Sequence, residues 1–161
     1  MPDLPSKQSL KDELAAHLTA ELEAVERAHR ETTKAATHEE AKPENDKDTR
    51  ALEQSYLARG QAARVEDLRT GLADVHAMTT RAFTAENPIA LGALITAEEG
   101  DATLLLLLAP AGGGLRLASG AVQVVTARSP LGRALLGKHE GDDIELPLAG
   151  KVRELSILSV D

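Results

Sequence analysis

Two long stretches of this chain repeat an apolar residue every three or four positions, and a proline separates them. The repeated residues are Leu14, Leu18, Leu22 and Val25 in the first stretch and Val65, Leu68, Leu72 and Val75 in the second. This spacing places apolar side chains along one stripe of a helix, as in the seam of a narrow coiled coil. Pro43 cannot lie inside a helix, because it lacks an amide donor and clashes with the preceding turn. The pattern predicts an antiparallel helical hairpin over residues 1–84, with an acidic tip near residues 38–48.

The residues on either side of the predicted tip are small, which favours two arms within one chain. They are Ala35, Ala36, Ala51, Ser55 and Ala58. A zipper between separate chains usually keeps Leu or Ile at such positions. We therefore expect a monomer, with a plain coiled-coil adaptor as the alternative for this half of the chain.

After Asn87-Pro88 the pattern changes to short apolar runs separated by turn residues. These runs cover residues 89–95, 103–109, 115–117, 122–126, 144–148 and 152–160. Runs of this length between glycine-rich turns predict β-strands. Ser129-Pro130, followed by an apolar turn and Gly137, predicts one short capped helix. The chain is thus expected to be α+β, with a small antiparallel β domain over residues 85–161.

The composition excludes several classes of function. The formal net charge of −8 argues against a general nucleic-acid binder, because phosphate contacts need clustered Lys and Arg. The absence of cysteine excludes disulfides and thiolate metal sites. The longest apolar run, residues 104–109, is too short to cross a bilayer, and the first residues lack the pattern of a secretory leader. We expect a cytoplasmic protein with no membrane partner.

The segment from Ser129 to Lys138 carries the most specific motif in the chain. It reads Ser-Pro-Leu-Gly-Arg-Ala-Leu-Leu-Gly-Lys, and a hairpin that begins at Gly141-Asp142 follows it. This string resembles the C-terminal domain of the Gre family of bacterial transcript-cleavage factors. The resemblance implies an FKBP-like C-terminal domain after a coiled-coil hairpin, which is the same order that the residue pattern predicts.

The resemblance also implies a function. In Gre factors the hairpin enters the secondary channel of bacterial RNA polymerase, and the C-terminal domain binds the rim of that channel. Carboxylates at the tip help to hold a second Mg²⁺ at the polymerase active site, where backtracked RNA is hydrolysed. Such a factor is not itself an enzyme and has no cofactor of its own. It meets the 3′ end of the nascent RNA only within the polymerase complex.

At the tip, Glu44 and Asn45 match the Glu-Asn of the family, whereas Ala41 stands where the family has Asp. The candidate catalytic carboxylates are Glu40, Glu44, Asp46 and Asp48. Of these, Glu44 and Asp46 are expected to share Mg²⁺ with the polymerase. Ala41 cannot bind a metal ion, so a non-cleaving modulator of the polymerase is the alternative.

Two further groups of residues follow from the resemblance. Arg128, Ser129 and Pro130 match the loop that binds the polymerase rim, although the family often has Asp or Asn in place of Arg128. Arg50 and Arg59, on the second arm, are candidates to lie near the RNA. An FKBP-like fold also leaves a prolyl isomerase open, but one Tyr and one Phe argue against an aromatic pocket.

Overall fold

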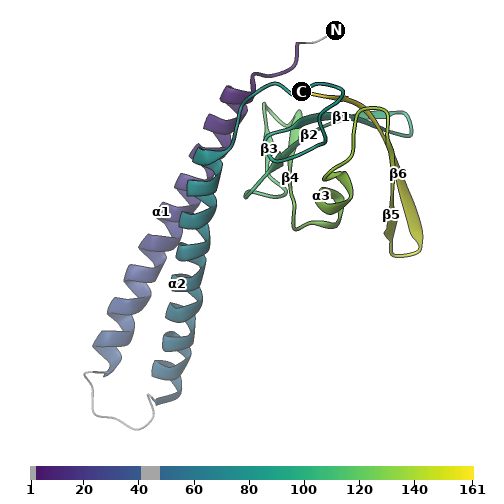
Figure 1. The fold of residues 1–161 in the computed structure, drawn as a ribbon. Coiled ribbons are helices and arrows are strands. Elements are labelled where there is room, and N and C mark those ends of the chain that lie inside the picture. Colours follow the sequence, from purple (N-terminus) through teal and green to yellow (C-terminus); the bar gives the residue numbers. More distant parts are fainter. Residues whose placement is uncertain (1–2, 41–47) are drawn as a thin grey trace. The chain divides into compact units, whose positions relative to one another are not determined.

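The computed structural model describes residues 3–40 and 48–161, with side chains for residues 3–35 and 49–161. In these residues two long helices are followed by a six-stranded sheet and one short helix (Figure 1). The predicted α+β class, with two long helices before a small β domain that carries one short helix, is therefore confirmed. The described residues form two compact units, which are Ala16–Leu72 and Met1–Ala15 together with Ala73–Asp161.

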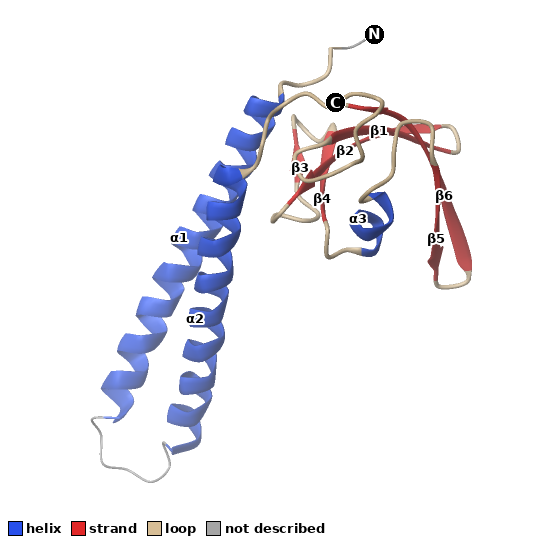
Figure 2. Cartoon of the chain, viewed as in Figure 1, coloured by secondary structure: helices blue, strands red, loops and turns tan. Residues whose placement is uncertain are grey.

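The unit Ala16–Leu72 is made by the two long helices, α1 (Lys7–Glu40) and α2 (Asp48–Ala77), which run antiparallel (Figure 2). Their sequences are rich in Ala, Glu, Leu and Arg, which are strong helix formers. Along the seam Leu18, Val65 and Leu68 are buried, as the apolar repeat predicts. Two ion pairs join the helices, Arg64 with Glu21 and Arg69 with Glu26. No helix in the described ranges is both long and apolar enough to span a membrane.

The sheet has the strand order β3-β4-β2-β1-β6-β5. The strands are β1 (Leu94–Glu99), β2 (Ala102–Ala109), β3 (Arg116–Leu117), β4 (Val122–Thr126), β5 (Asp143–Leu148) and β6 (Lys151–Val160). All neighbouring pairs are antiparallel except β2 and β4, which run parallel, so the sheet is mixed and not antiparallel throughout as expected. A parallel pair needs a crossover of about a dozen residues, and residues 110–121 supply it.

The main core lies on the face of the sheet that the short helix α3 (Pro130–Leu135) covers. Leu106 and Leu108 point to this face because side chains alternate along a strand, and they pack with Leu135. Leu107 points to the opposite face, where it is also buried. The run of leucines in β2 therefore supplies both faces of a central strand.

A β-bulge in β6 allows two residues three positions apart to face the same core. Ala97 pairs with Ile157, but Thr96 pairs with Ser159, so Leu158 is the extra residue on the β6 side. Leu158 is exposed, whereas Ile157 and Val160 are both buried in the main core. Strict alternation would have sent Val160 to the other face.

The first strand begins at Leu94, later than the expected start at residue 89. The Ile89 amide donates to the Lys138 carbonyl (2.7 Å), and the Ile89 carbonyl accepts from the Gly137 amide (2.8 Å). Ile89 is thus hydrogen-bonded to the connection after α3 and not to the sheet. A turn at Gly92, with φ +94°, then brings the chain into β1.

The first turns of α1 belong to the compact unit that contains the sheet and pack within it. Leu14 lies against Gly112, and Glu13 Oε2 accepts a hydrogen bond from the Ala118 amide at 3.0 Å. The Lys7 ammonium donates to the Arg81 carbonyl (2.5 Å) and to Asp161 O (3.0 Å). Burial lowers the pKa of Lys7, since the site removes water from the charged amine. The boundaries between the two compact units fall within α1 and α2. The domain boundary between residues 84 and 85 stays a prediction from the sequence pattern.

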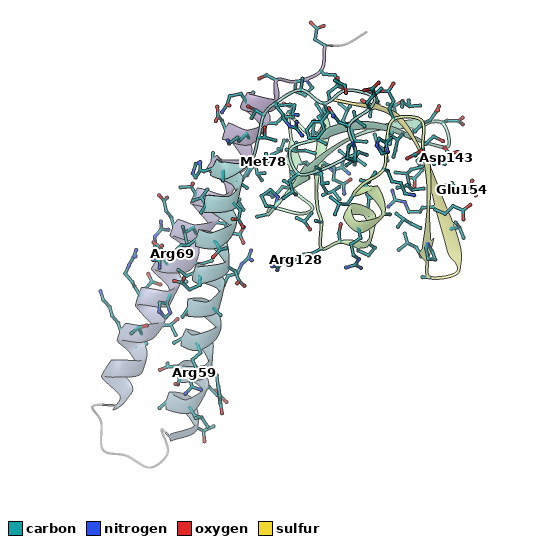
Figure 3. All side chains as sticks on the ribbon, in the orientation of Figure 1. Arg59, Arg69, Met78, Arg128, Asp143 and Glu154 are labelled. Carbon is teal, nitrogen blue, oxygen red and sulfur yellow. The ribbon has the colours of Figure 1, made fainter. Side chains whose placement is uncertain are left out.

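The strand β5 forms one edge of the sheet and carries charged residues and a proline. Asp143 and Glu145 are exposed, and Pro147 lies near the end of the strand. In the register with β6, Glu145 lies opposite Glu154, which is also exposed; Figure 3 labels Asp143 and Glu154 on these strands. Like charges that face each other across two strands are unfavourable.

Candidate functional site

The predicted helix start at Ser129 is confirmed, and its geometry explains the Ser-Pro pair. Ser129 has extended backbone angles (φ −74°, ψ 155°), and its Oγ accepts a hydrogen bond from the Gly132 amide at 3.0 Å. The same Oγ donates to the Thr126 carbonyl at 2.8 Å. Pro130 occupies the first turn, where its missing amide costs nothing. Ser129 therefore caps α3 and also joins it to the end of β4.

Gly132 allows α3 to approach β4 more closely than any other residue would. A Cβ on Gly132 would lie 2.6 Å from the Thr126 carbonyl carbon, and closer still to its oxygen. Gly132 is buried, and Thr126 is held in the parallel pairing of β4 with β2. The third position after the serine is thus a glycine for a steric reason.

Arg128 lies at the surface immediately before the capped helix (Figure 3). Its backbone carbonyl accepts a hydrogen bond from Arg133 Nη1 at 2.6 Å. This bond involves the backbone of Arg128, and Arg128 as a residue is exposed to solvent. Arg128, Ser129 and Pro130, which the family resemblance implies as the polymerase-binding loop, lie between the end of β4 and the first turn of α3. Their role in binding stays a prediction.

These three residues line a groove with a volume of about 530 Å³. One wall is the start of α3 with Leu131, and the facing wall carries Leu146, Leu148 and Arg153 from β5 and β6. Residues 123–126 of β4 and the turn at residues 113–114 complete the lining. Leu148 is 45% exposed although it is a leucine. An open apolar groove with a few polar groups on its walls is a typical binding site.

Sequence reasoning missed the wall of the groove that β5 and β6 form. The sequence pattern indicates only that Leu146 and Leu148 belong to a strand. The groove is formed where elements that are distant in sequence meet, so the pattern does not reveal it. The sequence does not indicate that Leu148 is exposed. The alternation of apolar residues along β5 does not tell which end of the strand is left uncovered.

Arg153 is held in place by Glu99 of β1 through two hydrogen bonds. Arg153 Nε donates to Glu99 Oε2 at 2.6 Å, and Nη2 donates to Oε1 at 3.2 Å. The hydrogen bonds from Arg153 lower the pKa of the Glu99 carboxyl, because they favour its charged form. A bidentate pair of this kind fixes the direction of the guanidinium at the groove.

We expect the Glu99–Arg153 pair to stabilise the protein at neutral pH and to lose this effect in acid. Glu99 has a folded-state pKa below its usual value of 4.5, so its contribution is present above that pH and disappears as the pH falls through the folded pKa. The Glu99 side chain is 32% exposed and that of Arg153 36% exposed, so solvent limits the contribution to about 0.5–1 kcal/mol.

Urea unfolding of the wild type and of Glu99→Gln at about pH 7 and about pH 3 tests this linkage. The difference between the two proteins should shrink at the lower pH. Glu98→Gln, which changes the neighbouring exposed carboxylate, is the matched control and should have a smaller effect at pH 7. An equal difference at both pH values would contradict the role of Glu99.

The predicted tip residues Glu44 and Asp46 lie outside the described residues, as do the side chains of Glu40 and Asp48. Their expected roles in catalysis and Mg²⁺ binding therefore stay predictions. Among the residues that are described, no group of three or more His, Asp or Glu side chains is placed to hold a metal ion.

Arg50 and Arg59, the candidates to lie near RNA, are both exposed on α2. The Arg59 guanidinium lies over the Tyr56 ring at 5.5 Å from its centroid, which is a cation–π contact. Figure 3 labels Arg59 on this helix. The structure thus brings Arg59 together with an exposed aromatic ring, and Arg50 lies in the first turn of the same helix.

In a comparison with family models, the last third of the chain is similar to one described family. The family model "Transcription elongation factor, GreA/GreB, C-term" matches residues 114–161. No curated protein sequence matches the chain.

Solved structures similar to the chain include the transcription factor Gfh1, with 23% identity, a TM-score of 0.40 and coverage of 91% of this chain and 92% of that chain. Gfh1 of Thermus aquaticus has 21% identity, a TM-score of 0.40 and coverage of 90% and 92%. The elongation factor GreA/GreB of Nitrosomonas europaea has 24% identity, a TM-score of 0.33 and coverage of 62% and 90%.

Proposed function

We propose that this chain is a divergent member of the Gre family of transcription elongation factors, and that it binds bacterial RNA polymerase and regulates elongation from the secondary channel. The family-model match to residues 114–161 supports this proposal. The observation that carries the proposal is the match of the family model to the segment that holds Ser129, Pro130 and the groove. In this proposal the groove binds the rim of the channel. The chain acts on the polymerase and is not itself an enzyme.

The length of α1 supports the proposal. The helix α1 contains 34 residues, which at about 1.5 Å per residue gives about 50 Å. A helix pair of this length can carry side chains from the surface of a large enzyme to an interior site. Such a role needs few apolar residues outside the seam. The exposed positions of α1 agree with this, because most of them carry charged or small residues.

The acidic tip supplies ligands of the right chemistry for Mg²⁺, since divalent hard cations prefer carboxylate oxygens. A second Mg²⁺ in the polymerase active site would activate water for hydrolysis of the RNA phosphodiester. In this chain Glu44 and Asp46 would provide oxygen ligands, and Glu40 and Asp48 would add negative charge beside them. Arg50 and Arg59 would then lie on the arm that faces the RNA.

Replacing Glu44 by alanine is expected to abolish transcript cleavage if the tip is catalytic, because a metal ligand is lost. The measurement is the rate of RNA shortening in stalled, backtracked polymerase complexes with the full-length chain. Glu53→Ala removes an equal charge from an exposed position of α2 and should leave the rate unchanged.

A non-cleaving modulator is the second candidate, and Ala41 favours it because this position lacks the carboxylate of the family. For a modulator the wild type would not shorten the RNA but would still alter the rate of elongation. Failure of the wild type to bind core RNA polymerase would overturn both forms of the proposal.

A further inference from the structure

One side of α2 is exposed to solvent and carries two large apolar side chains. Residues three and four apart are neighbours on the surface of a helix, so positions 49, 52, 53, 56, 59, 60 and 63 share one side. Seven exposed residues occupy these positions, and we call them the α2 face: Thr49, Leu52, Glu53, Tyr56, Arg59, Gly60 and Ala63. Leu52 is 54% exposed and Tyr56 61% exposed. Large apolar side chains that lie together in water favour a partner that covers them.

The charges of the α2 face lie symmetrically about Tyr56. Glu53 comes three residues before Tyr56, and Arg59 comes three residues after it. Neither charge forms an ion pair with a residue that the structure describes, and the Arg59 guanidinium lies over the Tyr56 ring. Two copies of α2 that run antiparallel about a twofold axis at Tyr56 bring Glu53 of each copy opposite Arg59 of the other. The α2 face therefore has the charge complementarity that a contact between identical surfaces needs.

The same antiparallel register places a large residue opposite a small one. Leu52 comes four residues before Tyr56 and Gly60 four residues after it, so Leu52 of one copy meets Gly60 of the other. A Cβ on Gly60 would have no atom within 4 Å, which shows that this position is open. Gly60 also lines a groove of about 530 Å³ between the two long helices, where Ala24 and Ala28 of α1 are among the lining residues. This groove has room for the Leu52 side chain of a second copy, as a hole has for a knob.

From this register we propose that the α2 face binds a second copy of the same chain, as an antiparallel and twofold-symmetric pair of helices. Tyr56 meets its own counterpart at the axis, and a Glu53–Arg59 pair lies on each side of it. Residues 49–63 span about 20 Å of helix. A contact of this length buries less surface than the roughly 1,600 Å² of a standard interface, so the dimer is weak and forms at high protein concentration.

The expectation of a monomer concerned the seam between the two long helices, and this pairing leaves that seam inside each chain. The inference does not depend on the proposed function. It bears on that function in one respect, because Arg59 in such a dimer faces a second chain and not RNA.

Sedimentation equilibrium of the full-length chain between about 1 and about 200 µM measures the dimerisation. Glu53→Arg and Arg59→Glu are each expected to weaken it by about tenfold or more, because each change places like charges opposite each other twice in the dimer. The double variant exchanges the two charges and should return the dissociation constant to within about threefold of the wild type. Glu23→Arg makes the same change at an exposed position of α1, outside the α2 face, and should stay within about twofold. Circular dichroism checks that each variant keeps its helices.

Cross-linking between tyrosines reports the position of the axis, because the chain has one tyrosine. Photo-oxidation should join two copies through dityrosine in the wild type and in the double variant, and less in either single charge variant. Tyr56→Phe keeps the apolar ring and should still dimerise, without forming the cross-link.

A wild type that stays monomeric up to about 200 µM would overturn the inference. So would a dimer that neither single charge variant weakens, or one that the double variant fails to restore. Binding to polymerase, or its absence, changes none of these outcomes, so the proposed function is tested separately.

Discussion

Replacing Gly132 by alanine is expected to lower the free energy of unfolding of the sheet-containing unit by about 3 kcal/mol or more. The new Cβ would lie 2.6 Å from the Thr126 carbonyl carbon, a backbone atom that cannot move aside. Thr126 pairs with Ala109 in the sheet and accepts hydrogen bonds from the amide and the hydroxyl of Ser129. Relief of the clash would therefore break the cap of α3 or the end of the parallel pair. Urea unfolding measured by circular dichroism gives the change.

The matched control is Gly60→Ala, the same substitution at a helical glycine of α2. No atom lies within 4 Å of a Cβ at this position, so the alanine meets open space. Alanine is the better helix former, and the change should stabilise α2 by about 0.5–1 kcal/mol. Equal destabilisation by the two substitutions would contradict the steric role of Gly132.

Replacing Leu14 by alanine is expected to cost about 3 kcal/mol, within the range for leucines that are fully buried. Leu14 is 0% exposed and lies against Gly112 in the crossover between β2 and β4. Its loss leaves a cavity between the first turns of α1 and this crossover. Glu13, the residue before Leu14, accepts a hydrogen bond from the Ala118 amide. Hydrogen exchange at this amide should therefore become faster in Leu14→Ala.

Leu22→Ala is the control for Leu14→Ala, because it makes the same change in the same helix at a half-buried position. We expect a loss of about 1 kcal/mol from that change, since less apolar surface is uncovered. If Leu14→Ala left exchange at Ala118 unchanged, the first turns of α1 would not support the crossover. Residues 85–161 would then be expected to keep their stability without the helices.

The elements that depend on local rules could be predicted from the sequence. The two helices follow from the apolar repeat, and the structure describes them as Lys7–Glu40 and Asp48–Ala77. Ser129 was identifiable as a helix cap because capping involves residues only three positions apart. The strands from residue 102 onward begin and end close to the predicted positions for the same reason.

The features that depend on contacts distant in sequence could not be predicted. Alternation tells which residues of β2 and β4 are buried, but not that the two strands run parallel. Leu158 has no property that marks it as the bulged residue, and Ile89 reads as a strand residue although it pairs with Gly137 and Lys138. Of the groove, only the Arg128–Pro130 wall was visible in the sequence, because the family motif lies there.

The edge strand β5 has a consequence for the protein at high concentration. A free edge offers unpaired amides and carbonyls to the edge of any other sheet, which is a common start of aggregation. On β5 the exposed Asp143 and Glu145 repel a second copy of the same strand, and Pro147 has no amide to donate. The charge of Glu145 is unfavourable opposite Glu154 within the sheet. The same charge opposes the addition of further chains to this edge as a fibre, and so favours solubility.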